Sequence, residues 1–204
     1  NSPSDSRSIM LGLMSFGRGG PVIVGRKVIL RLPRAADHAQ WAALRRESRA
    51  FLEPWEPQWA EDELSLAAWK HRLRRYRSDF RQGTAVAFLI FDNATQKLTG
   101  GINISNIRRG VSQSGSVGYW MGERYAGKGF MGEALGLAVD HCFRTLRLHR
   151  LEAACIPQNE RSMRVLEKAG FRREGLLHAY LKINGLWQDH YLYALVADDA
   201  AAKS

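Results

Sequence analysis

The first half of the chain combines one alternating segment with two helical ones. Residues 22–34 alternate apolar and basic positions and predict a strand that ends near Pro33. Apolar residues at helical spacing predict helices over residues 35–50 and 64–81. The intervening FLEPWEPQW carries two prolines, which a continuing helix does not tolerate. We therefore expect a strand and two helices with a proline-rich loop between the helices.

The second half alternates between strand and helix patterns. TAVAFLIFD, KLTGGINISNIRR and SGSVGYWMG are bounded by turn residues and predict three consecutive antiparallel strands. Residues 130–147 carry one apolar stripe and predict a helix, which RLEAACIP follows as a strand. Residues 159–169 predict a short helix that Gly170 ends, and Asn184 with Gly185 predicts the turn of a final hairpin. This order indicates one mixed α/β domain with a single central βαβ unit.

Length and composition fit one globular domain. The 204 residues, 45% of them hydrophobic, suffice for one substantial core. Residues 1–20, rich in Ser, Gly and Arg, predict a flexible tail ahead of a domain over residues 21–204. No apolar run approaches the roughly 18 residues that a membrane span needs. Cys142 and Cys155 form no C-x-x-C and the histidines form no H-x-x-x-H pair, so we expect no metal and a cytoplasmic location.

The chain is strongly basic. Its formal net charge of +10 and its pI near 10.1 indicate an anionic partner without naming it. Much of the excess lies in HRLRRYR, residues 71–77, and over residues 144–150. Three explanations stay open, namely a solvated helix face, a phosphate-rich cofactor, and a ribosomal or nucleic-acid neighbour.

A glycine-rich stretch, GKGFMG at residues 127–132, has the G-x-G-x-x-G spacing of dinucleotide-binding loops. It follows three antiparallel strands and no acid ends the next strand, so a dinucleotide site is not expected. Lys128 lacks the following Ser or Thr of a Walker A loop. What remains is R-x-x-G-x-G from Arg124 to Gly129, whose free N–H groups predict an anion site. A glycine turn that only starts a helix explains the same letters.

The sequence around that loop resembles a known family. R-x-x-G-x-G, then a helix, a strand, N-x-x-S and A-G-F, is the pattern of GNAT-type N-acetyltransferases. The similarity is greatest to the RimJ/RimL-like group and, within it, to the RimJ-like branch, the ribosomal-protein N-terminal alanine acetyltransferases, and it runs from Val24 to Val196. The matching segments are FLEPWEP, SNIRRG, GKGFMGEAL, LHRLEA, PQNERSMRVLEKAGFRREG and INGLWQDH. The resemblance implies the GNAT fold, a mixed, mostly antiparallel sheet whose central strands splay apart.

The resemblance also implies where acetyl-CoA binds. In the family the glycine loop holds the pyrophosphate, and the backbone of Trp120 and Met121 would meet the acetyl and pantetheine groups. Asn159 would bind pantetheine, and Ser162 would give a proton to the departing sulfur. Both could instead be structural, as an N-cap and a first-turn residue. The residues expected to contact acetyl-CoA are Trp120, Met121, Arg124, Tyr125, Ala126, Gly127, Lys128, Gly129, Phe130, Met131, Asn159 and Ser162.

The acceptor side is less defined, because Leu181 stands where the sister RimL-like branch has a carboxylate. Glu53, Asp189 and His190 remain as candidates for a base or an amine-binding group. We favour Glu53, in the loop between the two early helices, although a turn carboxylate is an equal explanation. Asp189 and His190 are adjacent on a strand, so only one of them can face a cleft. A chain of water molecules is the alternative base.

Aromatic residues suggest a groove for a peptide. Trp55, Trp59 and Tyr180 could wall it, although such residues lie more often in a core. The leading hypothesis is acetyl transfer to the N-terminal amine of a protein, with alanine and a ribosomal protein as the expected acceptor. A small-molecule amine is the main alternative, such as an antibiotic, a polyamine or an aminoacyl nucleotide. A non-enzymatic protein that binds CoA or ribosomal RNA and a nicotinamide-binding protein are also considered. We expect a monomer or a homodimer.

Overall fold

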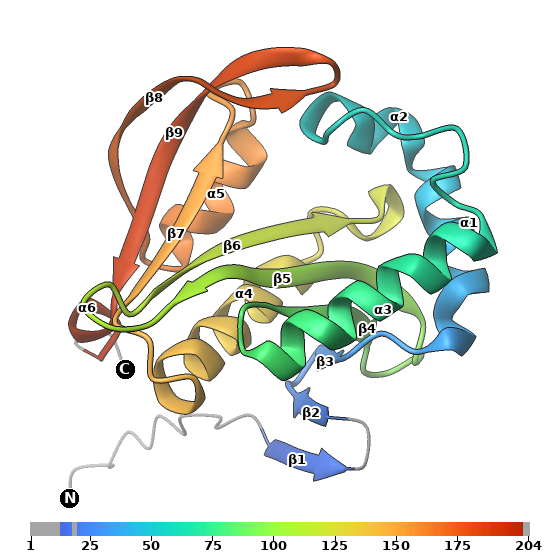
Figure 1. Ribbon diagram of the computed structural model, residues 1–204, viewed down its shortest axis with the longest axis horizontal. Helices are drawn as coiled ribbons and strands as arrows, with labels where there is room; N and C mark the ends of the chain where they lie inside the picture. The colour runs from blue at the N-terminus through green and yellow to red at the C-terminus, as the bar shows by residue number, and fades with distance from the viewer. Residues whose placement is uncertain (1–12, 18–19, 202–204) are drawn as a thin grey trace, which may run out of the picture.

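Nine strands form one mixed sheet in the computed structural model, which describes residues 13–17 and 20–201 (Figure 1). The order is β1-β2-β3-β4-β5-β6-β7-β9-β8, and of these neighbours only β6 and β7 run parallel. The strands are β1 (Leu13–Gly17), β2 (Gly20–Val24), β3 (Val28–Arg31), β4 (Val86–Asp92), β5 (Leu98–Arg108), β6 (Ser114–Met121), β7 (Arg150–Cys155), β8 (Arg172–Ile183) and β9 (Leu186–Val196). The expected mixed, mostly antiparallel sheet is confirmed.

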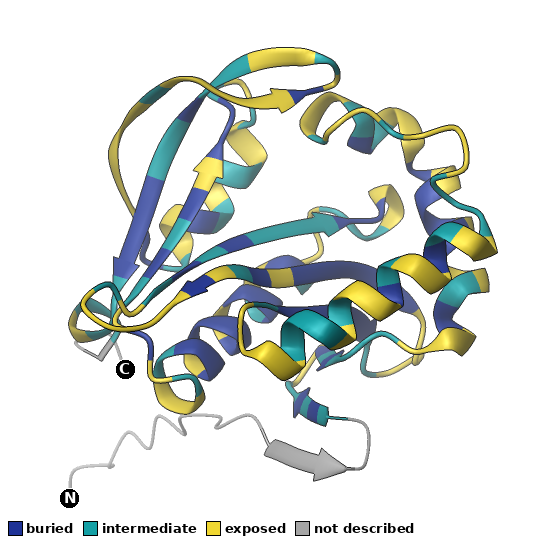
Figure 2. Cartoon of the chain, viewed as in Figure 1, coloured by how far each residue is buried: buried dark blue, intermediate teal, exposed yellow. Residues whose placement is uncertain are grey.

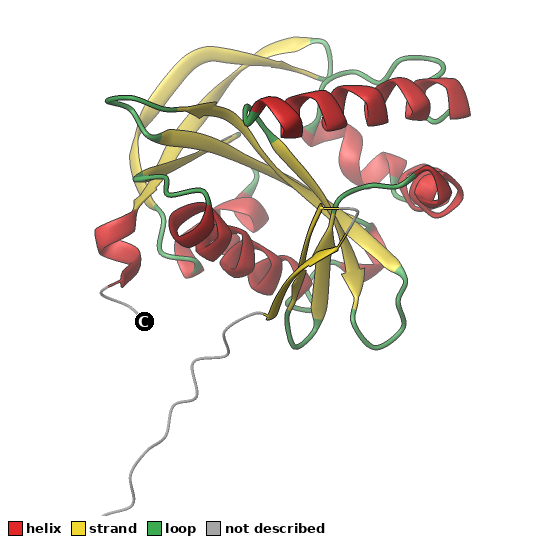
Figure 3. Ribbon diagram, turned by 60° about the horizontal axis from the view of Figure 1, so that its bottom comes forward, coloured by secondary structure: helices red, strands yellow, loops and turns green. Residues whose placement is uncertain are grey.

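The helices cover both faces of this sheet (Figure 3). They are α1 (His38–Glu47), α2 (Arg49–Leu52), α3 (Leu66–Gln82), α4 (Phe130–Asp140), α5 (Glu160–Lys168) and α6 (Ala197–Ala201), with short turns η1 (Ala35–Asp37), η2 (Glu53–Trp55), η3 (Glu123–Tyr125) and η4 (His141–Thr145). On one face Trp41 and Trp69 share a cluster with Leu89 of β4. On the other, Leu135 of α4 shares a cluster with Phe88. Because Phe88 and Leu89 are neighbours on a strand, the centre of the sheet is buried on both sides, as Figure 2 shows.

The N-terminal part differs from the prediction in two places. The strand expected over residues 22–34 is two antiparallel strands, β2 and β3, joined by a turn in which Gly25 N donates to Val28 O at 2.8 Å. A Cβ on Gly25 would lie 2.6 Å from a carboxylate oxygen of Glu133, so glycine lets this turn approach α4. β1 lies inside the range expected to be a flexible tail, and residues 1–12 fall outside the described part of the chain.

The helix expected over residues 130–147 is regular only as far as Asp140. It continues as the π-helical turn η4, which Leu146 N closes by donating to His141 O at 2.9 Å. The His141 ring is buried there, edge to face with Phe88 and with centroids 5.6 Å apart. Burial lowers the pKa of His141 to about 4, so the ring is neutral at pH 7.

The parallel pair of β6 and β7 is short, and the resulting gap positions the site. Residues 114–116 of β6 pair with residues 150–152 of β7, and the ladder ends there. Beyond this point β6 stays bonded to β5 and β7 to β9, so the two strands separate (Figure 1). The central unit is therefore β6–α4–β7 with splayed strands, as expected.

Candidate active site

The glycine loop lies at the end of the gap, between β6 and α4. Gly127 and Gly129 have φ angles of 75° and 81°, in the left-handed region that favours glycine. No described residue accepts a hydrogen bond from the backbone N–H groups of residues 127–132. These groups lie at the positive end of the α4 dipole and together form an anion site.

Lys27 is a cation of this anion site that was not predicted from the sequence. Its Nζ donates to Lys128 O at 3.2 Å and lies 3.2 Å from the position of a Cβ on Gly129. Glu133, in the first turn of α4, accepts hydrogen bonds from the N–H groups of Arg26 and Lys27 and fixes their turn beside the loop. The sequence indication of this site was the turn-forming Gly-Arg-Lys at residues 25–27, which lies inside a segment that alternates like a strand.

Charge at the loop comes mainly from lysine. Arg124 is half exposed and lies 3.4 Å from Glu47 of α1, so its charge is partly balanced. No described carboxylate forms an ion pair with Lys27 or Lys128. Tyr125 and Phe130 close the side of the loop with an edge-to-face contact at 5.9 Å, and Met131 is buried beneath it. The predicted loop residues are therefore brought together, with two unpaired ammonium groups beside the free N–H groups.

The free edge of β6 presents backbone groups to the gap. Gly122 N donates to Thr99 O at 2.8 Å, and alternate residues of an antiparallel ladder bond to the same neighbour. The N–H of Met121 therefore points away from β5 and into the gap. Trp120 turns its indole to the face of α1 and α3, where Gly101 leaves room, since a Cβ there would lie 2.4 Å from Trp120 Nε1. A carbonyl oxygen in the gap can accept from Met121 N–H.

Asn159 and Ser162 stand at the start of α5, beside the gap. Asn159 is the N-cap, and its Oδ1 accepts from Ser162 N at 3.1 Å. Ser162 Oγ lies 2.9 Å from the hydroxyl of Tyr119, which reaches α5 from β6. Burial raises the pKa of the Tyr119 phenol, and the hydrogen bond with Ser162 only partly opposes this. The phenol therefore stays protonated and can donate to Ser162 throughout the physiological pH range.

Tyr119 and Cys155 complete this side of the gap, and neither was predicted from the sequence to have a role there. The Cys155 thiol ends β7 and donates to Asn159 O at 3.5 Å, and burial raises its pKa, so it is a neutral thiol. Strand alternation could have indicated the position of Tyr119, because a neighbour of Trp120 on a strand must face the other side of the sheet. Only the packing of α5 shows that this side holds Ser162.

A cavity of about 440 Å³ opens on the other face of β6. It lies between α1, α3, the loop over residues 56–63 and the strands β4, β5 and β6, and it reaches β6 at residues 118–120. Seven aromatic residues line it, namely Trp41, Trp59, Trp69, Tyr76, Phe88, Tyr119 and Trp120. The charged residues in its wall are Arg45, Glu56, Glu63, Arg72 and Arg75. Its size and its mixture of aromatic and polar walls fit a small molecule or the end of a peptide.

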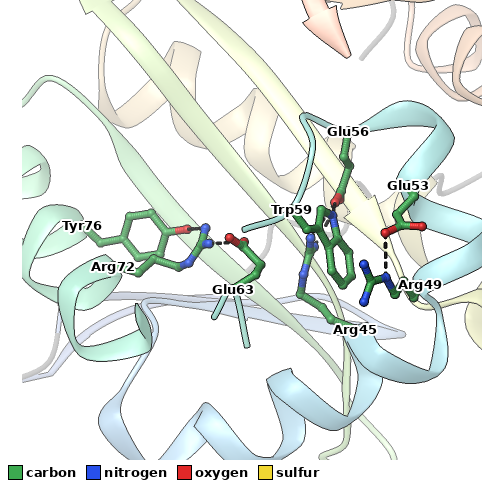
Figure 4. Close-up of polar contacts among 8 residues, drawn as sticks. All are labelled: Arg45, Arg49, Glu53, Glu56, Trp59, Glu63, Arg72 and Tyr76. Carbon is green, nitrogen blue, oxygen red and sulfur yellow. Dashed lines mark hydrogen bonds and ion pairs between the residues drawn. The ribbon is translucent and has the colours of Figure 1, made fainter. Parts of the chain in front are cut away.

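Ion pairs hold the wall of this cavity in place (Figure 4). Glu56 accepts from Arg45 at 2.5 and 3.2 Å and from Trp59 Nε1 at 2.8 Å. The Arg45 guanidinium lies 4.5 Å from the Trp59 ring centroid and 4.9 Å from that of Trp120, a cation–π arrangement. A second pair joins Glu63 and Arg72 from α3. Both carboxylates therefore already have cationic partners.

Glu53 and Trp55, two predicted acceptor residues, do not line the cavity. Glu53 pairs with Arg49 at 2.6 Å at the surface, and the Trp55 side chain is 37% exposed in the same turn. Trp59, by contrast, forms part of the cavity wall. Glu56, which was not among the predicted residues, stands where Glu53 was expected. The two residues differ by less than one helical turn in a proline-rich loop, so the sequence could not separate them.

The hairpin of β8 and β9 carries the remaining candidates. Asp189 accepts from Ala179 N at 2.8 Å and lies 3.0 Å from His178 Nδ1, and these contacts lower its pKa. His190 is buried with its ring 5.8 Å from that of the exposed Tyr180. None of these side chains lines the cavity. The hairpin nevertheless touches its wall, because Asn184 N in the turn donates to Glu56 O at 2.8 Å.

Neither a membrane-spanning helix nor a metal site is present within residues 13–17 and 20–201. No helix there is long and apolar enough to cross a membrane. No group of three or more His, Cys, Asp or Glu side chains there is arranged to hold a metal ion.

Comparison with known proteins agrees with this architecture. The family model of the acetyltransferase (GNAT) domain matches residues 27–172. The [ribosomal protein uS5]-alanine N-acetyltransferase of Escherichia coli (strain K12) is 37% identical over 173 residues, which cover 85% of this chain and 89% of that protein. Mycobacterium smegmatis RimJ in complex with CoA-disulfide has a TM-score of 0.81 at 36% identity, covering 84% of this chain and 83% of that one.

A second solved structure agrees. It is the ribosomal-protein-S5-alanine acetyltransferase of Vibrio fischeri, with a TM-score of 0.81 at 35% identity, covering 87% of this chain and 97% of that one. Sequence and structure thus match the same group of enzymes over most of their lengths. The chain belongs to the GNAT family and is an N-acetyltransferase closely related to the ribosomal uS5 alanine N-acetyltransferases.

Proposed function

We propose that this enzyme transfers an acetyl group from acetyl-CoA to the N-terminal amine of a protein, with an N-terminal alanine and a ribosomal protein as the acceptor. One observation carries the proposal. The gap beside β6, which leads to the anion site of the glycine loop, and the cavity on the other face meet at residues 118–121. Two substrates that enter from opposite faces can therefore meet at one short strand segment. Two of the relatives named above, from Escherichia coli and Vibrio fischeri, are alanine acetyltransferases of a ribosomal protein, which supports the choice of acceptor.

The residues fit the demands of thioester aminolysis. The N–H groups of residues 127–132, with Lys27 and Lys128, bind the pyrophosphate of acetyl-CoA. Met121 N–H donates to the thioester carbonyl as negative charge develops on its oxygen. Ser162 gives its proton to the departing sulfur and is held for this by Tyr119. An α-amine has a pKa near ~8, so a useful fraction is neutral at pH 7 without a strong base. The proton that the amine loses as the amide forms passes to water, and a proton from water restores Ser162.

At the acceptor end, the cavity receives the first residue of the peptide, and its aromatic walls exclude water around the amine. Glu53, Trp55, Tyr180 and Asp189 lie outside the cavity, so we place their contacts further along the acceptor chain. Glu53 remains the first choice for a charge contact with the acceptor. We expect the enzyme to work in the cytoplasm, as a monomer or a homodimer, with its basic surface available to the ribosome.

A small-molecule amine is the second candidate acceptor, because a cavity of about 440 Å³ is of a size that holds one. An assay with acetyl-CoA separates the two. An alanine-initiated peptide should be acetylated with a higher kcat/KM than any of a panel of polyamines, aminoglycosides and aminoacyl nucleotides. Turnover of a small amine without turnover of the peptide would overturn the proposal. Mass spectrometry of cellular N-termini, with and without the enzyme, would then identify the protein acceptor.

A further inference from the structure

The exposed side of α3 is cationic along its length. Six of its 17 residues are Lys or Arg and one is acidic, a net of five positive charges out of the +10 of the whole chain. Five of the cations are exposed, and four of these follow at intervals of four, three and four residues, which places the four on one side of the helix. We call them the basic stripe, and they are Lys70, Arg74, Arg77 and Arg81. At ~1.5 Å per residue the stripe is about 16 Å long.

The basic stripe does not stabilise the fold. No described carboxylate forms an ion pair with any of its four side chains, and Asp79, the one acid of α3, is half-buried. Like charges three or four residues apart on a helix destabilise it by roughly 0.2–0.5 kcal/mol per pair. On α5, by contrast, Arg164 pairs with Glu160 at 2.9 Å. A row of unbalanced cations with a net cost to folding indicates a partner outside the molecule.

We propose that the basic stripe docks on the phosphate backbone of RNA. An interface with another protein has an apolar or aromatic centre, and a helix that lies on a membrane has an apolar face. Between Lys70 and Arg81 the exposed residues of α3 are all basic or histidine. Phosphate contacts need only cationic donors, and the guanidinium groups of Arg74 and Arg77 offer paired N–H groups that match phosphate oxygens.

The role that we assign to this RNA contact rests on the proposed function, acetyl transfer to a protein N-terminus. The same helix lines the acceptor cavity through Trp69, Arg72 and Tyr76. RNA held on the basic stripe would therefore keep an N-terminus that emerges from a ribonucleoprotein within reach of the cavity. The absence of exposed aromatic side chains from this part of α3 means that bases are not stacked, so binding is independent of RNA sequence.

Fluorescence anisotropy with a single-stranded RNA of about 20 nucleotides tests the proposal. Four phosphate contacts predict a slope of about −3 for the logarithm of the association constant against the logarithm of salt concentration. Arg74→Glu with Arg77→Glu should weaken binding at least about 10-fold and reduce the slope by about 1.4. The control is Arg164→Glu with Lys168→Glu, which makes the same change of net charge on α5 and should alter the dissociation constant less than about threefold.

The α3 variant should acetylate a free alanine peptide as the wild type does, because the basic stripe lies outside the cavity and the gap. Equal weakening by the two double variants would overturn the proposal, since net charge would then explain binding. So would tighter binding to vesicles containing phosphatidylserine than to RNA, or binding that does not depend on salt. Wild-type enzyme that binds RNA as expected but acetylates no peptide would overturn the proposed function and leave the RNA contact standing.

Discussion

Two hydroxyl groups in the gap, those of Tyr119 and Ser162, have the protonation states that acetyl transfer needs. Tyr119 is held neutral by burial, and its hydroxyl lies 2.9 Å from Ser162 Oγ. A phenol that keeps its proton can donate to the serine and leave the serine proton free for a thiolate. Ser162 alone is a weak acid, so a partner that stabilises its oxygen as the proton leaves would lower the barrier.

Tyr119→Phe should therefore reduce kcat about 10-fold and leave the KM for acetyl-CoA within about twofold. Ser162→Ala should reduce kcat further, by about 100-fold. Both losses should shrink with thioesters whose thiol has a lower pKa, because such a leaving group needs less protonation. Steady-state kinetics with a series of acyl donors measures this. Tyr193→Phe is the control, since it removes a buried phenol that donates to Glu167 instead, and an equal loss there would refute the role of Tyr119.

Gly127→Glu should abolish acetyl-CoA binding. Its φ of 75° already disfavours a side chain, and the new carboxylate would stand where phosphates bind. Isothermal titration calorimetry measures the affinity, and a loss of at least about 100-fold is expected. Gly110→Glu is a matched control, because Gly110 has a φ of 64° and, like Gly127, has nothing within 4 Å of its would-be Cβ. Unchanged affinity in Gly127→Glu would remove the phosphate role from the loop.

At the scale of elements, one carboxylate ties together the wall of the acceptor cavity. Glu56 pairs with Arg45 of α1, accepts from Trp59 in its own loop, and its carbonyl accepts from Asn184 in the β8–β9 turn. Helix α1, the loop of Glu56 and the distant β8–β9 turn therefore all contact this residue. Arg45 has only 7% of its side chain exposed, so loss of its partner would leave a buried charge unpaired.

Glu56→Gln should lower the free energy of unfolding by about 3 kcal/mol and raise the KM for the peptide acceptor, with the KM for acetyl-CoA unchanged. Urea denaturation and two-substrate kinetics measure the two effects. Glu53→Gln is the control for stability, because its ion pair with Arg49 is largely exposed and contributes less than about 1 kcal/mol. If Glu53→Gln raised the acceptor KM more than Glu56→Gln did, Glu53 and not Glu56 would organise the acceptor site.

At the scale of the whole molecule, stability should depend on pH through a core histidine. The pKa of His141 is about 4 in the folded protein and ~6.5 in an unfolded chain, so the unfolded chain binds the proton more readily between these values. The free energy of unfolding should fall by about 3 kcal/mol as pH drops from about 6.5 to about 4. Above about pH 6.5 His141 is neutral in both states, so the full stability is present there. Denaturant titrations at several pH values measure it.

His141→Phe should remove most of this pH dependence, because phenylalanine keeps an apolar ring beside Phe88 without a titrating group. His149→Phe is the control, since His149 is exposed and its removal should leave the dependence in place. A wild-type stability that stays flat between pH 6.5 and 4 would contradict the neutral, buried state of His141.

Most elements could be predicted from the sequence, and the misses have physical causes. The three strands that precede the glycine loop, α5 with its Asn159 cap, and the hairpin turn at Asn184 are in place, because periodicity and turn residues act locally. The turn at Gly25 was missed because apolar residues stand on both sides of it, over residues 22–24 and 28–30, and look like one strand. The π-helical turn at His141 was missed because its apolar stripe is nearly that of an α-helix.

The sequence by itself determined the glycine loop, the cap of α5 and the central βαβ unit, since each depends on neighbours along the chain. It also supplied the motifs by which the family resemblance was seen. Only the tertiary structure decided that Lys27 joins the loop, that Tyr119 meets Ser162, and that Glu56 rather than Glu53 lines the cavity. These contacts join residues from separate elements, and the distance between such residues depends on how strands splay and helices pack, which no local pattern encodes.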